Sequence, residues 1–137
     1  MTEEVAQWLE IANGDMGIAQ FLFDNRWPRP LEYVCYLSQQ CGEKALKAYL
    51  IHCGVEFPFT HDLRRLCKIC MKHSDAFGGL YEFCAALTPY AVDTKYPSKL
   101  ELDEAMAVSA LRKAEAILET VTSEIGNANG DAERENE

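Results

Sequence analysis

The chain has 137 residues, of which 48% are hydrophobic and 26% charged, and its net charge is −9. This length suits one domain with a substantial core, and the composition is ordinary for a soluble globular protein. No apolar run approaches the roughly 20 residues that a membrane-spanning helix needs, and the acidic N-terminus lacks the basic start and apolar stretch of a secretory signal. We therefore expect a cytoplasmic protein with no membrane partner.

Hydrophobic residues recur at helical spacing through most of the chain, and the first stripe predicts a helix over about residues 3–23. The segment 25–30 carries two prolines and ends this helix. A second, longer helix is predicted over residues 31–52. Within it Gly42 weakens helix propensity by roughly 1 kcal/mol relative to alanine, so its presence there indicates the close approach of another helix.

Three further helices are predicted at about residues 61–73, 80–87 and 100–125. Thr60 is the expected N-cap of the first of these. No strand-like alternation of useful length is present, so the fold class predicted is all-α: an antiparallel four-helix up-and-down bundle with one additional short helix. We expect this bundle to span residues 1–125 and the acidic segment 126–137 to be a disordered tail, because it has little to bury.

Six cysteines, at positions 35, 41, 53, 67, 70 and 84, fall within or at the ends of the predicted helices. Buried, reduced thiols explain them better than disulfides do. Cys67 and Cys70 form a Cys-x-x-Cys pair with His61 and His73 nearby in the sequence, but a metal site needs a second pair of ligands that converges with the first. The sequence offers no such pair, so it predicts no metal and no cofactor.

The predicted second helix carries a polar seam made of Gln40, Glu43, Lys44 and Lys47. The spacing i, i+3, i+4, i+7 places these four side chains on one face. The seam could hold a site, or it could be a solvated face on which Glu43 and Lys47 form a favourable i, i+4 pair. The region 44–72 is basic although the chain is acidic, which favours a local anionic ligand over broad, sequence-blind binding of nucleic acid.

Two further pairs of residues are candidates for the same site. His61 could orient a phosphate or act as an acid or base, while Asp62 could instead complement the dipole of the helix that follows. Lys95 and Tyr96 precede the last helix, and Tyr96 could stack on a base. The lysines of the seam could hold phosphates as point charges.

Three stretches of this sequence, taken in order, resemble the HEPN domain, the nucleotide-binding domain of prokaryotes and higher eukaryotes. They are residues 40–50, Thr60–Leu63 and Tyr90–Pro97, and the resemblance covers about residues 3–125. It implies a helical module that binds a nucleotide or RNA, works beside a nucleotidyltransferase-like partner and pairs as a homodimer. The ligand-binding residues expected on this basis are Gln40, Glu43, Lys44, Lys47, His61, Asp62, Lys95 and Tyr96.

Many HEPN domains are metal-independent ribonucleases whose motif is an arginine followed, after a few residues, by a histidine. No arginine of this chain has a histidine at that spacing, because His61 precedes Arg64 and Arg65. The family's usual arginine before Tyr-Pro is Lys95, which keeps the charge but loses bidentate phosphate recognition. We therefore name no catalytic residue. Two alternatives stay open: a divergent ribonuclease of a toxin–antitoxin system, and a non-catalytic scaffold whose polar seam forms a dimer interface.

Overall fold

A computed structural model describes residues 1–91 and 101–135 of the chain, with side chains described as far as residue 127. These residues form helices and connecting segments, and no strand occurs among them. The α-helices are α1 (Glu3–Asn25), α2 (Leu31–His52), α3 (Leu63–Met71), α4 (Tyr81–Leu87) and α5 (Glu104–Glu135), and the 3-10 helices are η1 (Asp75–Leu80) and η2 (Thr88–Ala91).

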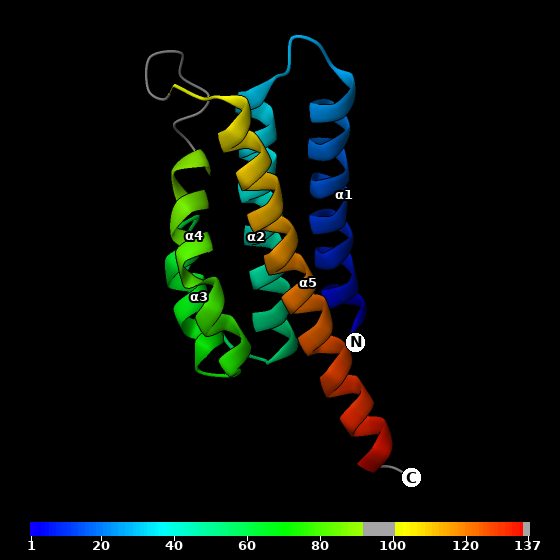
Figure 1. Ribbon diagram of the computed structural model, residues 1–137. Coiled ribbons are helices and arrows are strands. Elements are labelled where there is room, and N and C mark those ends of the chain that lie inside the picture. The colour runs from blue at the N-terminus through cyan, green and yellow to red at the C-terminus, as the bar shows by residue number, and fades with distance from the viewer. Residues whose placement is uncertain (92–100, 136–137) are drawn as a thin grey trace.

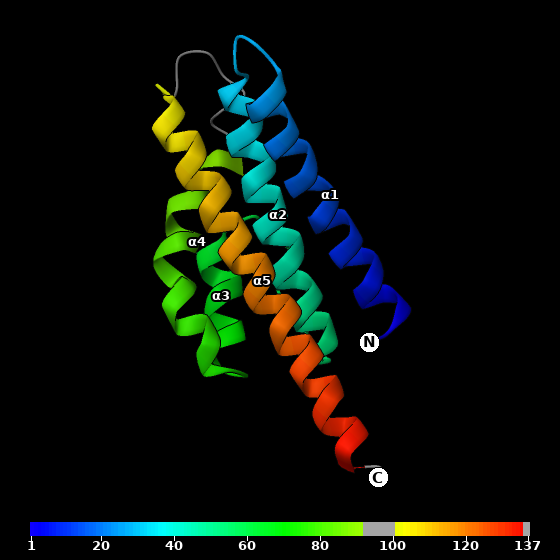
Figure 2. The same cartoon turned by 45° about the vertical axis from the view of Figure 1, so that its right-hand side comes forward.

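The second helix, α2, is the centre of the bundle. It lies between α1 on one side and the short helices α3 and α4 on the other, and α5 packs along it (Figures 1 and 2). α1 and α4 run in one direction, while α2 and α5 run in the opposite direction (Figure 1). The expected all-α, up-and-down bundle is thereby confirmed, with α3 as the additional short helix.

Other parts of the bundle approach α2 closely at Gly42. A Cβ atom added at Gly42 would lie 3.2 Å from the Cδ1 atom of Leu63 and 3.4 Å from that of Ile117. The close approach expected at this glycine is therefore confirmed. Because neighbours surround α2, most of its side chains from Val34 onward are buried, polar ones included.

The start of α3 differs from the sequence-based expectation. The helix begins at Leu63, and its N-cap is Asp62, whose Oδ1 atom accepts a hydrogen bond from the backbone N–H of Arg64 at 3.0 Å. Thr60 is not the cap: its Oγ1 atom accepts from the N–H of Asp62 at 3.1 Å. The side chain of Asp62 satisfies one of the free N–H groups of the first turn. Because the cap is Asp62, α3 begins later in the chain than a cap at Thr60 would place it.

The last helix, α5, begins at Glu104, and the side chain of Asp103 accepts a hydrogen bond from the N–H of Met106 at 2.7 Å. Its backbone is helical as far as Glu135, which takes it into the segment that we expected to be disordered. The end of α5 projects beyond the other helices in both views (Figures 1 and 2). The boundary of the bundle at residue 125 stays a prediction.

All six cysteines are free thiols; five of them are buried and Cys53 is partly exposed. Burial raises the pKa of Cys35 and of Cys41 to about 12. These thiols therefore serve as small core residues. In the part of the chain that the structure describes, every helix is too short or too polar to cross a bilayer.

Candidate functional site

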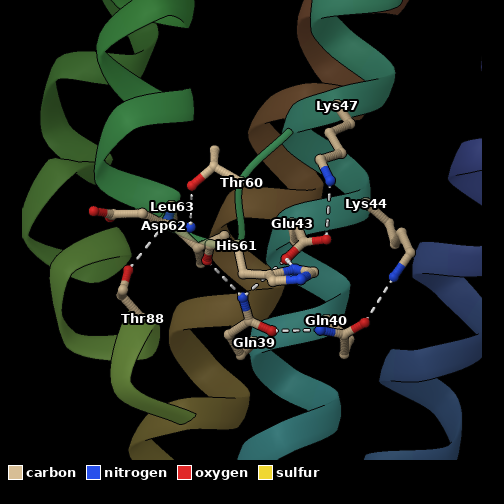
Figure 3. Close-up of polar contacts among 10 residues, drawn as sticks. All are labelled: Gln39, Gln40, Glu43, Lys44, Lys47, Thr60, His61, Asp62, Leu63 and Thr88. Carbon is tan, nitrogen blue, oxygen red and sulfur yellow. Dashed lines mark hydrogen bonds and ion pairs between the residues drawn. The ribbon is translucent and has the colours of Figure 1, made fainter. Parts of the chain in front are cut away.

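Glu43 lies at the centre of a buried polar network. Its side chain is only 3% exposed. Its Oε1 atom lies 2.8 Å from Nδ1 of His61 and 3.2 Å from Nε2 of Gln39, and its Oε2 atom lies 3.1 Å from Nζ of Lys47 (Figure 3). Gln39, Glu43, Lys47 and His61 are called the Glu43 network below.

The hydrogen bonds of this network determine the charge of Glu43. Burial acts to raise the pKa of its carboxyl group, but the hydrogen bonds from His61, Lys47 and Gln39 outweigh burial and lower that pKa. Glu43 is therefore ionised at neutral pH, and an ionised carboxylate only accepts hydrogen bonds. Nδ1 of His61 must then carry a hydrogen, which leaves Nε2 as the ring nitrogen available to another group.

The backbone around His61 is held on both sides. Nε2 of Gln39 donates to the carbonyl oxygen of His61 at 3.0 Å, which ties the connector between α2 and α3 to the middle of α2. Two residues after His61, the backbone N–H of Leu63 donates to Oγ1 of Thr88 in η2 at 3.2 Å. The imidazole itself is 56% exposed. The fold therefore fixes the position of His61 while leaving much of its ring open to solvent.

The rest of the polar seam joins this network through Gln39. Nζ of Lys44 donates to Oε1 of Gln40 at 2.8 Å, and Nε2 of Gln40 donates to Oε1 of Gln39 at 2.7 Å (Figure 3). A continuous chain of hydrogen bonds thus crosses α2 from Lys44 to His61. Our sequence reasoning missed Gln39, although its i, i+4 spacing to Glu43 was a usable signal.

The interpretation of the seam as a solvated face is wrong for its two inner members. Counting backbone and side chain together, Glu43 is 2% exposed and Lys47 is 6% exposed. The reason is the central position of α2, because the connector between α2 and α3, with His61 against Glu43 and Phe59 near Lys47, covers the side of the helix that a peripheral helix would turn to water. The Glu43–Lys47 pair itself is present, at 3.1 Å. Glu43 is enclosed by its own chain, so the seam is also unavailable as a dimer interface at this residue.

Asp62 does not join the Glu43 network. Its carboxylate points away from Glu43 (Figure 3) and pairs with the guanidinium of Arg64 through two hydrogen bonds of 3.0 Å. The hydrogen bonds from Arg64 lower the pKa of Asp62. Lys95 and Tyr96 lie outside the described residues. The structure therefore brings together five of the predicted residues: Gln40, Glu43, Lys44, Lys47 and His61.

The arrangement has no arginine beside the histidine, and it supplies a carboxylate, an imidazole and two ammonium groups. Every buried side-chain nitrogen or oxygen atom among the described residues has a hydrogen-bond partner. The network therefore needs no ligand to satisfy its buried atoms. What it offers to a ligand is its outer edge, which consists of the imidazole and the outer lysine, Lys44.

Comparison with known proteins shows the family of this chain. The family model of the HEPN domain matches residues 5–125. TT1696 from Thermus thermophilus is 25% identical, with a TM-score of 0.75 over 89% of this chain and 98% of that chain. ST0689, an archaeal HEPN homologue, is 23% identical and shares the fold, with a TM-score of 0.70 over 91% of this chain and 99% of that chain. No curated protein has a matching sequence.

Proposed function

Because this chain belongs to the HEPN domain family, we propose that it is a non-catalytic module that binds the phosphate of a nucleotide or of a short RNA through His61. One observation carries this proposal: a half-exposed imidazole is held at 2.8 Å by a buried, ionised carboxylate. Such a ring is oriented before any ligand arrives, and pre-organisation of this kind reduces the cost of binding. In the imidazolium form both ring nitrogens donate, so Nδ1–H faces Glu43 while Nε2–H donates to a phosphate oxygen.

The lysines of the seam have different parts in this proposal. Lys47 is neutralised by Glu43 and supports the network from inside. Lys44 has no ion-pair partner among the described side chains. Burial raises the pKa of Asp15 on α1, and the positive charge of Lys44 acts to lower it. We therefore assign the second phosphate contact to Lys44, with Gln40 holding its ammonium group. Asp62 caps α3 and has no direct contact with the phosphate in this proposal. Lys95 and Tyr96 stay predicted contacts of the ligand.

Isothermal titration calorimetry, in which ATP, GTP or a short single-stranded RNA is added to the protein, tests the proposal. Replacing a charged hydrogen bond of this kind weakens binding by about tenfold, so His61→Ala and Lys44→Ala should each do so. The matched control is Lys72→Ala, because Lys72 is an exposed lysine at the far end of α3 and should bind as the wild type does. Equal affinities for all four proteins would remove this site from the function.

A ribonuclease is the second candidate, and the same pair of residues favours it. A histidine whose Nδ1 donates to a carboxylate is a common acid–base device, and His61 with Glu43 has this form. Incubating structured and single-stranded RNA with the protein in EDTA tests the idea. Cleavage that disappears in His61→Ala would support catalysis, and cleavage no greater than that of the variant would reject it.

We also propose that the module is a homodimer that pairs through α1. Three large apolar side chains, Ile11, Ile18 and Phe21, share one side of α1 and are 49%, 53% and 64% exposed. Sedimentation equilibrium of Ile18→Glu should show a monomer where the wild type is a dimer. Val108→Glu, at an apolar residue of α5 that is 42% exposed, should leave association unchanged.

A further inference from the structure

Phe59 is the most exposed large hydrophobic side chain among the described residues, at 95%. A phenylalanine gives up roughly 1.5–3 kcal/mol of burial energy when it stays in water. Its ring nevertheless lies beside the proposed phosphate site. The ring centroids of Phe59 and His61 are 6.1 Å apart in an edge-to-face arrangement, and Nζ of Lys47 lies 5.7 Å from the centroid of Phe59.

The connector holds Phe59 in this exposed position. On one side, Phe57 packs against the core, and Pro58 fixes a backbone angle between the two phenylalanines. On the other side, Gln39 binds the carbonyl oxygen of His61 at 3.0 Å. The exposed ring therefore sits between two anchored residues, so its exposure is a property of an ordered connector.

From this geometry we infer that Phe59 is a stacking platform for an unpaired nucleobase, an inference that rests on the phosphate site proposed above. An aromatic face stacks on any base, and the neighbouring imidazole takes the phosphate of the same nucleotide. Because Phe59 is 95% exposed, its ring is open to solvent and a base can reach it. The ligand class is thus a nucleoside phosphate with an accessible base, either free or within single-stranded RNA.

Titration of four probes separates the two contacts: AMP, ribose 5-phosphate, single-stranded oligoadenylate and duplex RNA. The variants are Phe59→Leu, which removes the aromatic face but keeps an apolar side chain, and Phe59→Trp, which enlarges that face. Phe59→Leu should weaken AMP binding by about tenfold and leave ribose 5-phosphate unchanged. Phe59→Trp should bind AMP at least as tightly as the wild type, with quenching of the new indole fluorescence.

The outcomes distinguish this inference from the proposal on which it rests. If His61→Ala weakens AMP binding and Phe59→Leu does not, the stacking platform is overturned and the phosphate site stands. If the wild type binds none of the probes, both are overturned. If Phe59→Leu changes self-association and not binding, Phe59 is a protein contact and the inference fails. Tighter binding of oligoadenylate than of AMP identifies RNA as the source of the base, and duplex RNA should bind more weakly because its bases are paired.

Discussion

The Nδ1 atom of His61 lies 2.8 Å from the Oε1 atom of Glu43, although the two side chains are 56% and 3% exposed. A solvent-exposed imidazole is thus hydrogen-bonded to a buried carboxylate. Glu43 contributes to stability and orientation, whereas His61 is the member of the pair that a ligand can reach. This division of roles lets the two residues be tested separately, one by unfolding and the other by binding.

Replacing Glu43 by glutamine should lower the free energy of unfolding by about 3 kcal/mol, because the buried ammonium of Lys47 loses its counter-charge. Chemical denaturation at pH 7 measures this change. Glu119→Gln, at an exposed residue of α5, is the matched control and should change stability by less than about 0.5 kcal/mol. A loss in Glu43→Gln no larger than that of the control would mean that the network contributes nothing to stability.

The same carboxylate should make stability depend on pH. The pKa of Glu43 in the folded chain is below its ordinary value of 4.5, so its contribution is complete above 4.5 and is lost as the pH falls through the folded-state pKa. The difference in the free energy of unfolding between the wild type and Glu43→Gln should therefore shrink as the pH falls below about 4.5. A gap that stays constant from pH 7 to pH 3 would contradict this assignment.

Two glycines in helices should respond oppositely to substitution. Gly14 in α1 has no atom within 4 Å of an added Cβ, so Gly14→Ala should stabilise the protein by about 0.5–1 kcal/mol through helix propensity. Gly42→Leu should destabilise it by about 1–3 kcal/mol, because the added side chain meets Leu63 and Ile117. Thermal unfolding of both variants measures this, and a stabilised Gly42→Leu would show that the contact around α2 is loose.

The thiols should differ sharply in reactivity. Five cysteines are buried, and Cys53 alone among the six is partly exposed. An aromatic disulfide reagent should modify about one thiol quickly in the native protein and the remainder only on unfolding. Cys53→Ala should remove the fast phase, whereas Cys84→Ala should keep it. Several thiols reacting at the fast rate would mean that the core opens readily.

Local patterns in the sequence predicted all five α-helices, although not the ends of α3 and α5, and indicated the family. The bounds of α2 were predicted as the structure has them, because an apolar row ends at a proline on one side and a glycine on the other. The i, i+4 spacing of Glu43 and Lys47 likewise placed the two groups in contact before any fold was known. Such features depend only on neighbours within one or two turns of helix.

The tertiary structure alone decided which way the seam faces. Spacing shows that Glu43 and Lys47 share a face, but whether that face meets water depends on the connector, which comes later in the chain. The hydrogen bond from Gln39 to the carbonyl oxygen of His61 is likewise a contact between residues distant in sequence, and the exposure of Phe59 depends on how the connector packs on α2. Burial and hydrogen bonding across a bundle belong to the packed chain, and no local pattern contains them.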